Sequence, residues 1–280
     1  MNKNYANPHE KPFKPRKFLK KKSLGQHFLR NKSVVETMVE KVIQSCKDAT
    51  VLEIGCGDGF LTEQILSKSG CSKLICLEID QHWASVVKEK FEHDPRLEMI
   101  NADALRVDWA SLNNLGKPMV LLANLPYNVA SPILRKLCQY SNIFAEGVVM
   151  VQEEVAQRTV ATEGRNLGFI SLFLQHSFNL SLLTKIGPES FSPPPKVDSR
   201  LVYFRPKPTK ITIDREESFW KFIKASFASP RRMLKNNLKG FNFDQKTIDE
   251  KAGLLRAQQM KMDQFIDLWQ NISQSSSAAE

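Results

Sequence analysis

Short apolar runs alternate with amphipathic stretches along the first half of the chain. Five runs rich in Val, Ile and Leu end in small or polar residues, which is typical of strands buried in a sheet. They lie at 50–57, 73–80, 97–105, 119–127 and 147–152. Helical spacing of apolar residues is found at 33–46, 60–70, 81–91 and 128–140. Because strands and helices alternate, the pattern predicts a mostly parallel, doubly wound α/β sheet.

The pattern changes after residue 152. Residues 169–187 and 196–206 predict one helix and two further strands, joined through the Pro-rich segment FSPPP at 191–195, which brings the sheet to seven strands. Beyond 205–210 the spacing of apolar residues is helical. We therefore expect a small all-α domain after a boundary at 205–210.

This all-α segment begins with two predicted helices. The first covers 219–227. The second has Ser229 as its N-cap and Pro230 at its first position, and it ends at Lys239 before Gly240. Two further helical stretches follow before a Ser-rich end.

Composition and cysteine usage narrow the class of protein. Of the 280 residues, 42% are hydrophobic and 25% are charged, as in ordinary globular domains. No apolar run reaches the roughly 20 residues that span a bilayer, and no apolar segment of a secretory signal is found at the start. The five cysteines form no C-x-x-C pair and have no histidine at zinc spacing. We interpret them as free thiols in a reducing compartment, expect no metal site, and place the protein in the cytoplasm.

Positive charge is concentrated in two segments. The net charge is +10, and residues 1–32 contain ten basic residues but one acidic residue. Residues 219–240 contain six basic residues and no acid. Either segment alone could be a solvated surface, but together they favour a nucleic-acid partner. The RNA-binding candidates are Lys221, Lys224, Arg231, Arg232 and Lys235.

A glycine-rich turn, EIGCGDG at 53–59, follows the first predicted strand. Gly55, Gly57 and Gly59 allow a tight turn and a close approach of the backbone to a ligand. The G-x-G-x-G spacing differs from the G-x-G-x-x-G of NAD-binding folds. It indicates a dinucleotide or S-adenosylmethionine site, with a plain tight turn as the alternative.

Acidic residues end the next two predicted strands. Glu78 can accept hydrogen bonds from both hydroxyls of a ribose, and Asp103 can accept one from the exocyclic amine of a cofactor adenine. Singly, each could be an exposed carboxylate or a helix cap. Because the carboxyl ends of parallel strands meet at one edge, the glycines and both acids together predict a nucleotide-cofactor site.

The fourth strand ends in Asn124, Leu125, Pro126 and Tyr127. An adenine N6 amine is a poor nucleophile, because its lone pair is delocalised into the ring. The Asn124 side-chain oxygen and the Leu125 carbonyl are candidate acceptors for its protons, and Pro126 biases Leu125 toward an extended backbone. Tyr127 offers a ring on which an extruded base can stack. The segment therefore predicts methylation of an amine that is held beside the activated methyl group of a sulfonium, so that positioning supplies much of the catalysis. The alternative is a Pro-containing turn with a tyrosine in the core.

These stretches resemble the ribosomal RNA adenine N6,N6-dimethyltransferases. The matching segments are KKSLGQHFL (21–29), EIGCGDG (53–59), LEID (77–80), ADAL (102–105), NLPYNVASPIL (124–134) and FSPPPKVDS (191–199). The resemblance implies a Rossmann-like class I methyltransferase sheet and a small helical C-terminal domain. It also implies S-adenosylmethionine as methyl donor. The implied reaction is dimethylation of two adjacent adenosines in a hairpin loop near the 3′ end of 16S rRNA, during ribosome biogenesis.

The resemblance also assigns roles to residues. Tyr127 and Phe191 would sandwich the target adenine. We interpret His27 as a cofactor contact rather than a general base, with a capping or core histidine as the alternative. Many members carry Pro and Leu where this chain has Cys56 and Asp58, so the detailed shape of that loop is open. The implied cofactor contacts are His27, Leu29, Gly55, Gly57, Glu78, Asp103 and Asn124.

We expect four segments: a disordered basic arm (1–20), the methyltransferase domain (21–206), a helical RNA-binding domain (207–272) and a loose tail (273–280). The expected partner is small-subunit rRNA in a pre-ribosomal particle, bound by a monomer. One alternative is a large-subunit rRNA methyltransferase of the macrolide-resistance type, against which FSPPPKVDS and the basic C-terminal patch argue. Another is a non-catalytic ribosome-assembly factor, which would have no use for an intact Asn-Leu-Pro-Tyr segment.

Overall fold

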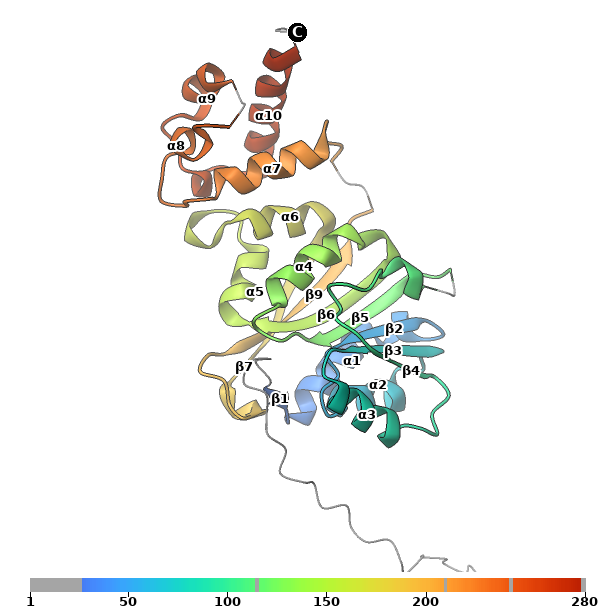
Figure 1. Ribbon diagram of the computed structural model, residues 1–280. Helices are drawn as coiled ribbons and strands as arrows, with labels where there is room; N and C mark the ends of the chain where they lie inside the picture. The colour runs from blue at the N-terminus through green and yellow to red at the C-terminus, as the bar shows by residue number, and fades with distance from the viewer. Residues whose placement is uncertain (1–26, 114–115, 209–210, 242–243, 278–280) are drawn as a thin grey trace, which may run out of the picture.

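A seven-stranded sheet forms the centre of the computed structural model, which describes residues 27–113, 116–208, 211–241 and 244–277. The strand order is β4-β3-β2-β5-β6-β9-β7 (Figure 1). Its strands are β2 (Thr50–Ile54), β3 (Lys73–Glu78), β4 (Leu97–Asn101), β5 (Met119–Asn124), β6 (Phe144–Gln152), β7 (Phe178–Ile186) and β9 (Ser199–Pro206). The neighbouring strands among β2 to β6 all pair in parallel, and β9 is antiparallel to both β6 and β7. The predicted mostly parallel, seven-stranded sheet is therefore confirmed.

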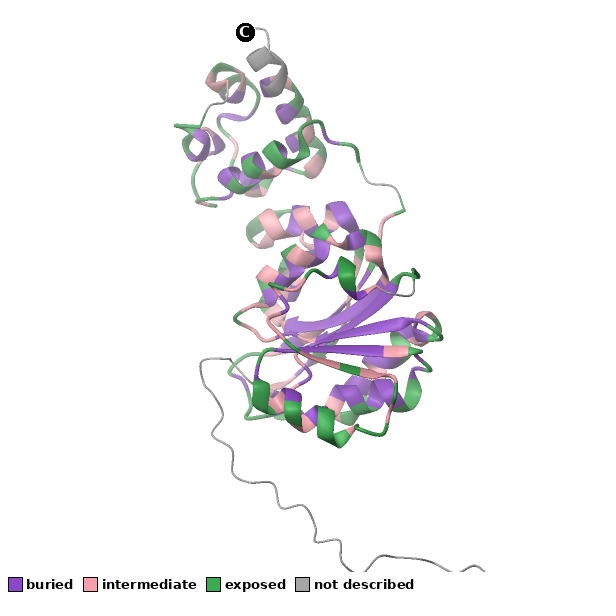
Figure 2. Cartoon of the chain, turned by 45° about the vertical axis from the view of Figure 1, so that its right-hand side comes forward, coloured by how far each residue is buried: buried purple, intermediate pink, exposed green. Residues whose placement is uncertain are grey.

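Helices cover both faces of this sheet. One layer consists of α1 (Lys32–Cys46), α2 (Phe60–Lys68) and α3 (Gln81–Lys90), and the other of α4 (Ala130–Gln139), α5 (Glu153–Val160) and α6 (Phe169–Ser177). Along β5, Val120 and Leu122 belong to the core under the first layer, and Leu121 belongs to the core under the second. Successive side chains of a strand point to opposite faces, so a strand between two helical layers must be apolar throughout. This explains the apolar runs of the central strands β2, β3 and β5, and Figure 2 shows the middle of the sheet as buried.

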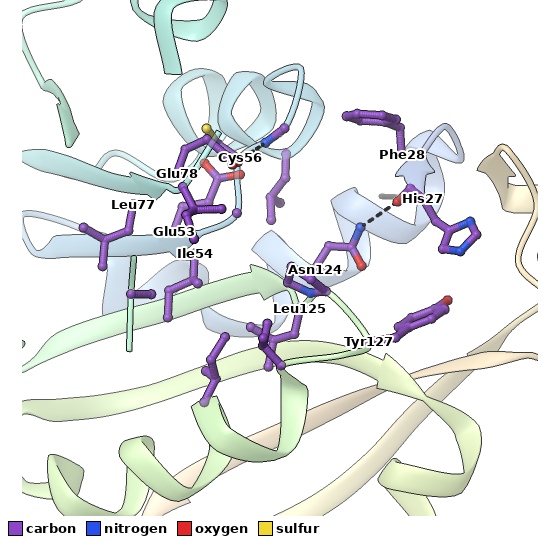
Figure 3. A pocket seen from close by; sticks show the side chains of 18 of the residues that line it. His27, Phe28, Glu53, Ile54, Cys56, Leu77, Glu78, Asn124, Leu125 and Tyr127 are labelled. Atoms are coloured by element: carbon purple, nitrogen blue, oxygen red, sulfur yellow. Dashed lines mark hydrogen bonds between the residues drawn. The ribbon is translucent and has the colours of Figure 1, made fainter. Parts of the chain in front are cut away.

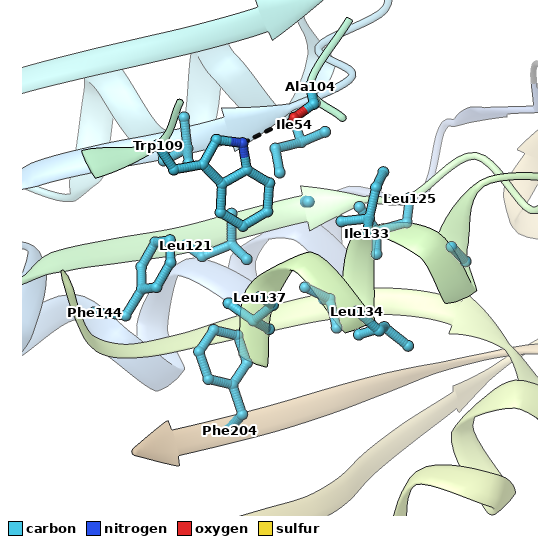
Figure 4. Packing of buried hydrophobic residues seen from close by; sticks show 14 of the residues in the cluster. Ile54, Ala104, Trp109, Leu121, Leu125, Ile133, Leu134, Leu137, Phe144 and Phe204 are labelled. Atoms are coloured by element: carbon cyan, nitrogen blue, oxygen red, sulfur yellow. Dashed lines mark hydrogen bonds between the residues drawn. The ribbon is translucent and has the colours of Figure 1, made fainter. Parts of the chain in front are cut away.

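Trp109 connects the loop after β4 to the second layer (Figure 4). Its fully buried indole donates a hydrogen bond from Nε1 to the Ala104 carbonyl at 2.9 Å. Its ring lies edge-on to Phe144, with 6.0 Å between the centroids. A buried donor needs an acceptor, so this hydrogen bond holds the segment that carries Asp103 in place beyond the end of β4.

A second, two-stranded sheet was not predicted. In it β1 (Phe28–Leu29) pairs antiparallel with β8 (Phe191–Ser192), with Leu29 opposite Phe191. Residues more than 160 positions apart in the sequence thus lie side by side. The pairing places the N-terminal motif against the Pro-rich loop.

Four helices follow the sheet: α7 (Glu216–Ser226), α8 (Leu234–Leu238), α9 (Gln245–Ala252) and α10 (Met262–Ser277). Their inward side chains form a separate core with Leu167 and Leu172 from the segment around the start of α6. The predicted boundary at 205–210 begins in the last two residues of β9 and precedes α7, and the division into domains at that point stays a prediction.

The predicted start of the second of these helices is wrong. Residues 229–232 form a turn closed by the Arg232 amide, which donates to the Ser229 carbonyl at 2.9 Å. Met233 then pairs with Arg256 as an isolated bridge, so α8 begins only at Leu234. This tertiary pairing overrides the capping signal of Ser229 and Pro230.

The disordered arm predicted at 1–20 lies outside the described part of the chain. Of the loose tail predicted at 273–280, the residues up to Ser277 belong to α10, and 278–280 lie outside the described part. Within the described residues, no helix is long and apolar enough to cross a membrane.

We expect Gly147→Ala to destabilise the sheet. Gly147 lies in β6 opposite Leu121 and Phe204, and an added Cβ would come within 2.5 Å of both the Leu121 carbonyl oxygen and the Phe204 ring. Overpacking of this kind costs about 2–3 kcal/mol of unfolding free energy. Urea unfolding measures the cost. Gly168→Ala is the control, because an added Cβ there meets nothing within 4 Å; equal stability of the two variants would contradict the prediction.

Candidate active site

A pocket opens at the carboxyl edge of the parallel strands (Figure 3). The turns after β2, β3, β4 and β5 line it from the sheet side, and His27, Phe28 and Leu29 close it from the N-terminal side. Open α/β sheets bind ligands at this edge. The four strand-end features of the sequence therefore meet in one cavity.

The glycine turn between β2 and α2 is left-handed at three positions. The backbone φ angles are 75° at Gly55, 53° at Gly57 and 82° at Gly59. An added Cβ on Gly57 would lie 3.0 Å from the Phe28 ring. Glycine is required here both by backbone conformation and by the close approach of Phe28.

Glu78 closes this turn from β3. Its Oε2 accepts a hydrogen bond from the Gly57 amide at 3.0 Å, and its Oε1 accepts one from the Asp80 amide at 2.9 Å. Burial raises the pKa of this carboxyl above its ordinary value. A carboxylate has about four lone-pair sites, so these two bonds leave capacity for ligand hydroxyls. The residue thus shapes the glycine turn and still fits the predicted ribose contact.

Asp103 lies in the pocket wall two residues beyond the end of β4 rather than in the strand itself. Its Oδ1 accepts from the Leu105 amide at 2.9 Å, and its Oδ2 lies 3.6 Å from Arg106 Nε. The capping interpretation and the predicted adenine contact are compatible, because the side chain still lines the cavity.

Asn124 is the last residue of β5. Its Nδ2 donates to the His27 carbonyl at 3.4 Å, which directs the amide nitrogen toward the N-terminal strand (Figure 3). The other amide atom, Oδ1, is thereby left to accept from a ligand. Leu125 follows with its amide bonded to the Met150 carbonyl at 3.1 Å, and both Leu125 and Pro126 line the pocket.

Tyr127 presents its ring at the mouth of the pocket. Its hydroxyl lies 2.6 Å from Ser199 Oγ, which fixes the ring against β9. The His27 imidazole stacks on it, with 5.4 Å between centroids and 30° between planes, and His27 Nδ1 donates to the Pro193 carbonyl at 2.9 Å. His27 therefore contacts Tyr127, the residue predicted to stack on the base, as well as the predicted cofactor site.

Phe191 lies apart from the other predicted residues. It does not line the pocket, its ring is 4% exposed, and it packs in the core beneath α1 while pairing with Leu29. Its predicted stacking on the target adenine stays a prediction.

Several contacts around the pocket were missed from the sequence. Arg30 forms an ion pair with Asp58 of the glycine turn at 2.6 Å, and Phe28 packs on Trp83 at 4.9 Å between ring centroids. No local pattern predicts these contacts, since each depends on where β1 is placed.

Glu53 is the other missed residue, although an acid inside the apolar strand TVLEI is a visible signal. Its side chain is 1% exposed and lines the pocket. Oε2 accepts from Thr62 Oγ1 at 2.8 Å and from Cys76 Sγ at 3.3 Å, whereas Oε1 has no partner among the described residues. Burial raises the pKa of Glu53 from 4.5 to about 7.

The predicted RNA-binding residues lie away from this pocket, on the C-terminal helices. Lys221 and Lys224 are exposed on α7, Arg231 and Arg232 are exposed in the turn that follows, and Lys235 is half-buried on α8. Lys221 also pairs with Glu217 at 2.7 Å. All five cysteines are free and buried, and the described residues contain no cluster of His, Cys, Asp and Glu arranged to hold a metal ion.

The strand order, the left-handed glycine turn, buried Glu78 and strand-end Asn124 define a Rossmann-like methyltransferase that uses S-adenosylmethionine. The buried acceptor on Glu78 and the cradle of the glycine turn fit that cofactor. Comparison with known proteins identifies the family. The ribosomal RNA adenine dimethylase family matches residues 17–275, and the chain belongs to it. It is an S-adenosylmethionine-dependent rRNA adenine dimethyltransferase.

Relatives of known name share most of the chain. The ribosomal RNA small subunit methyltransferase A of Persephonella marina is 35% identical over 255 residues, covering 90% of this chain and 93% of its own. The protein of the same name from Hydrogenovibrio crunogenus is 33% identical over 256 residues, with 88% and 94% covered. A dimethyladenosine transferase from Plasmodium falciparum has a similar structure, with a TM-score of 0.73 at 24% identity, covering 89% of this chain and 98% of that one. This last likeness shows the fold alone.

We expect Glu53→Gln to change how stability depends on pH. Because the folded-state pKa of about 7 exceeds the ordinary 4.5, the folded chain holds this proton more tightly than the unfolded chain. The contribution of protonated Glu53 to the free energy of unfolding is fully present below the ordinary pKa, and it is lost as pH rises through the folded-state pKa. The shift corresponds to about 3 kcal/mol.

Urea unfolding of wild type and Glu53→Gln from about pH 5 to about pH 8 tests this expectation. The wild type should lose stability relative to the variant as pH rises, since glutamine stays neutral. Exposed Glu89→Gln on α3 is the control and should track the wild type. Parallel curves for Glu53→Gln and wild type would contradict the assignment.

Proposed function

We propose that this enzyme dimethylates N6 of two adjacent adenosines near the 3′ end of small-subunit rRNA during ribosome assembly. The observation that carries the proposal is the placement of Asn124, Leu125, Pro126 and Tyr127 at the carboxyl end of β5, beside the pocket. The two named bacterial relatives are small-subunit methyltransferases, and this supports the small subunit over the large one. We further propose that the enzyme acts as a monomer on a pre-ribosomal small subunit in the cytoplasm.

In this proposal the pocket residues divide into two groups. Gly55, Gly57, Glu78 and Asp103, with His27 and Leu29 from the N-terminal side, hold S-adenosylmethionine. When bound, this cofactor supplies a methyl group already activated on a sulfonium. The chain therefore needs no covalent nucleophile, and its task is to position the target amine.

Asn124 and Leu125 then act on the amine. Asn124 Oδ1 is left available by the hydrogen bond from Nδ2 to the His27 carbonyl, and it accepts a hydrogen bond from one N6 proton. The Leu125 carbonyl accepts a hydrogen bond from the other N6 proton. These acceptors favour the geometry in which the nitrogen lone pair leaves the ring plane. Tyr127, fixed through Ser199, provides the face on which the base stacks. Base insertion has to displace the His27 ring or share Tyr127 with it, because 5.4 Å between the two centroids leaves no room for a base between them.

Asn124→Ala tests whether catalysis, rather than RNA binding, depends on the Asn-Leu-Pro-Tyr segment. Unmethylated small subunits are incubated with the enzyme and labelled S-adenosylmethionine, and dimethyladenosine is measured by mass spectrometry, with large subunits in parallel. We expect wild type to modify small subunits, and Asn124→Ala to lower kcat by about 10²–10³-fold while RNA affinity stays within about twofold. Asn179→Ala, exposed on β7, is the matched control. Unchanged activity of Asn124→Ala, or modification of the large subunit alone, would overturn the proposal.

The C-terminal basic residues are proposed to bind rRNA phosphates. Neutralising Arg231, Arg232 and Lys235 together should weaken binding and reduce the slope of log affinity against log salt by about 2–3, because each lost phosphate contact removes about 0.7–0.9. A control variant removes the same charge at Lys47, Lys88 and Lys117, which are exposed elsewhere. Equal slopes for the two triple variants would show that this patch is only surface.

A further inference from the structure

A second cavity lies between the start of α6 and the end of α7. Its walls come from α5 and the 164–170 segment on the sheet side, and from α7, the turn after it and Phe241 on the helical side. Gln258 ties the two sides together, since its Nε2 donates to the Arg165 carbonyl at 2.8 Å and to the Leu167 carbonyl at 3.4 Å. We call this cavity the junction groove.

The charged residues that line the junction groove are all basic. Arg158, Arg165, Lys221 and Lys224 line it, and no acidic residue is among its described lining residues. Arg158 and Lys221 pair with Glu154 and Glu217 on their own helices, whereas Arg165 and Lys224 form no ion pair within the described part of the chain. At least two cations are therefore available to a polyanion.

The floor of the groove is apolar and partly aromatic. Leu167, Phe169, Ile170 and Phe227 contribute to it, and Phe241 at its edge is 48% exposed. The Phe241 amide donates to the Leu238 carbonyl at 3.1 Å, which holds this residue at the end of α8. A duplex presents phosphates and keeps its base faces stacked, so it has no use for an apolar floor. Unpaired nucleotides offer both phosphates and exposed base faces.

One wall of the groove belongs to a helix that starts at the same edge of the sheet as the active-site pocket. Helix α5, which carries Arg158, starts directly after β6, and β6 is the neighbour of the strand that ends in Asn124. Figure 1 shows α5 next to the start of α4 and below α6. An RNA strand that presents a base to the pocket can therefore continue into the groove.

We propose that the junction groove binds an unpaired segment of the substrate RNA, with one base stacked on Phe241 and neighbouring phosphates paired with Arg165 and Lys224. The proposal rests on the proposed function for the identity of its ligand. It adds a site that contains residues from both sides of the junction and that distinguishes unpaired from duplex RNA.

The test is fluorescence anisotropy of the full chain with two labelled probes: an oligouridine of about 12 nucleotides and a duplex RNA of the same length. Phe241→Ala should weaken binding of the single strand about tenfold and leave the duplex within about twofold, because stacking is lost but charge is kept. Phe241→Trp should retain single-strand affinity. Leu254→Ala, which removes another exposed apolar side chain, is the control and should bind as wild type.

Arg165→Ala and Lys224→Ala test the contribution of charge. Each should reduce the slope of log affinity against log salt concentration for the single strand by about 0.7. Lys88→Ala, which removes an exposed charge on α3, is the control and should leave this slope unchanged. Three results would overturn the proposal. Phe241→Ala could leave the single-strand affinity unchanged, or it could weaken duplex binding as much as single-strand binding. The third is that polyglutamate, but not unlabelled oligouridine, displaces the labelled single strand.

Methylation of small subunits is measured on the same variants. Phe241→Ala should raise the substrate concentration for half-maximal rate with an unchanged maximal rate. Failure of wild type to methylate would contradict the proposed function and leave the anisotropy result standing, so the two proposals fail separately.

Discussion

Parallel pairing of β2 with both β3 and β5 is the constraint on which the site depends. Ile54 lies opposite Leu77 and Glu53 opposite Leu122, so the three strands end at nearly the same level. Each strand places one feature of the site there: β2 is followed by the glycine turn, β3 ends in Glu78 and β5 ends in Asn124. A shift of register by one residue would exchange the two faces of a strand and remove its contribution. Burial under helical layers on both faces makes such a shift costly.

The pocket couples two kinds of chemistry through the N-terminal strand. Phe28 packs on the glycine turn that is proposed to hold the cofactor, while His27 contacts Asn124 through its carbonyl and Tyr127 through its ring. One short segment therefore touches both the proposed cofactor site and the proposed base site. The Arg30–Asp58 ion pair adds a link between the N-terminal segment and the glycine turn. Such a partly exposed pair contributes little stability by itself.

Most of the chemistry-bearing residues could be predicted because each lies at the end of a strand. Apolar runs locate strands, and parallel strands end at one edge, so the amino-acid sequence is sufficient to bring Gly55, Glu78 and Asn124 together. Glu53 was missed because an acid in a buried strand contradicts the pattern that identifies the strand. Phe191 was assigned by resemblance, and its burial beneath α1 depends on packing that no local signal records.

The sequence alone therefore determined the succession of the main strands and helices along the chain, the sheet edge at which we propose that the cofactor binds, and the charge that favours RNA. These follow from short-range periodicity and from the strong preference of apolar side chains for the interior. Only the tertiary structure decided that β1 pairs with β8, that His27 stacks on Tyr127, and that a turn replaces the first residues of the predicted second C-terminal helix. Each of these depends on contacts between residues far apart in the chain, whose free energy is available only after the sheet and its layers have formed.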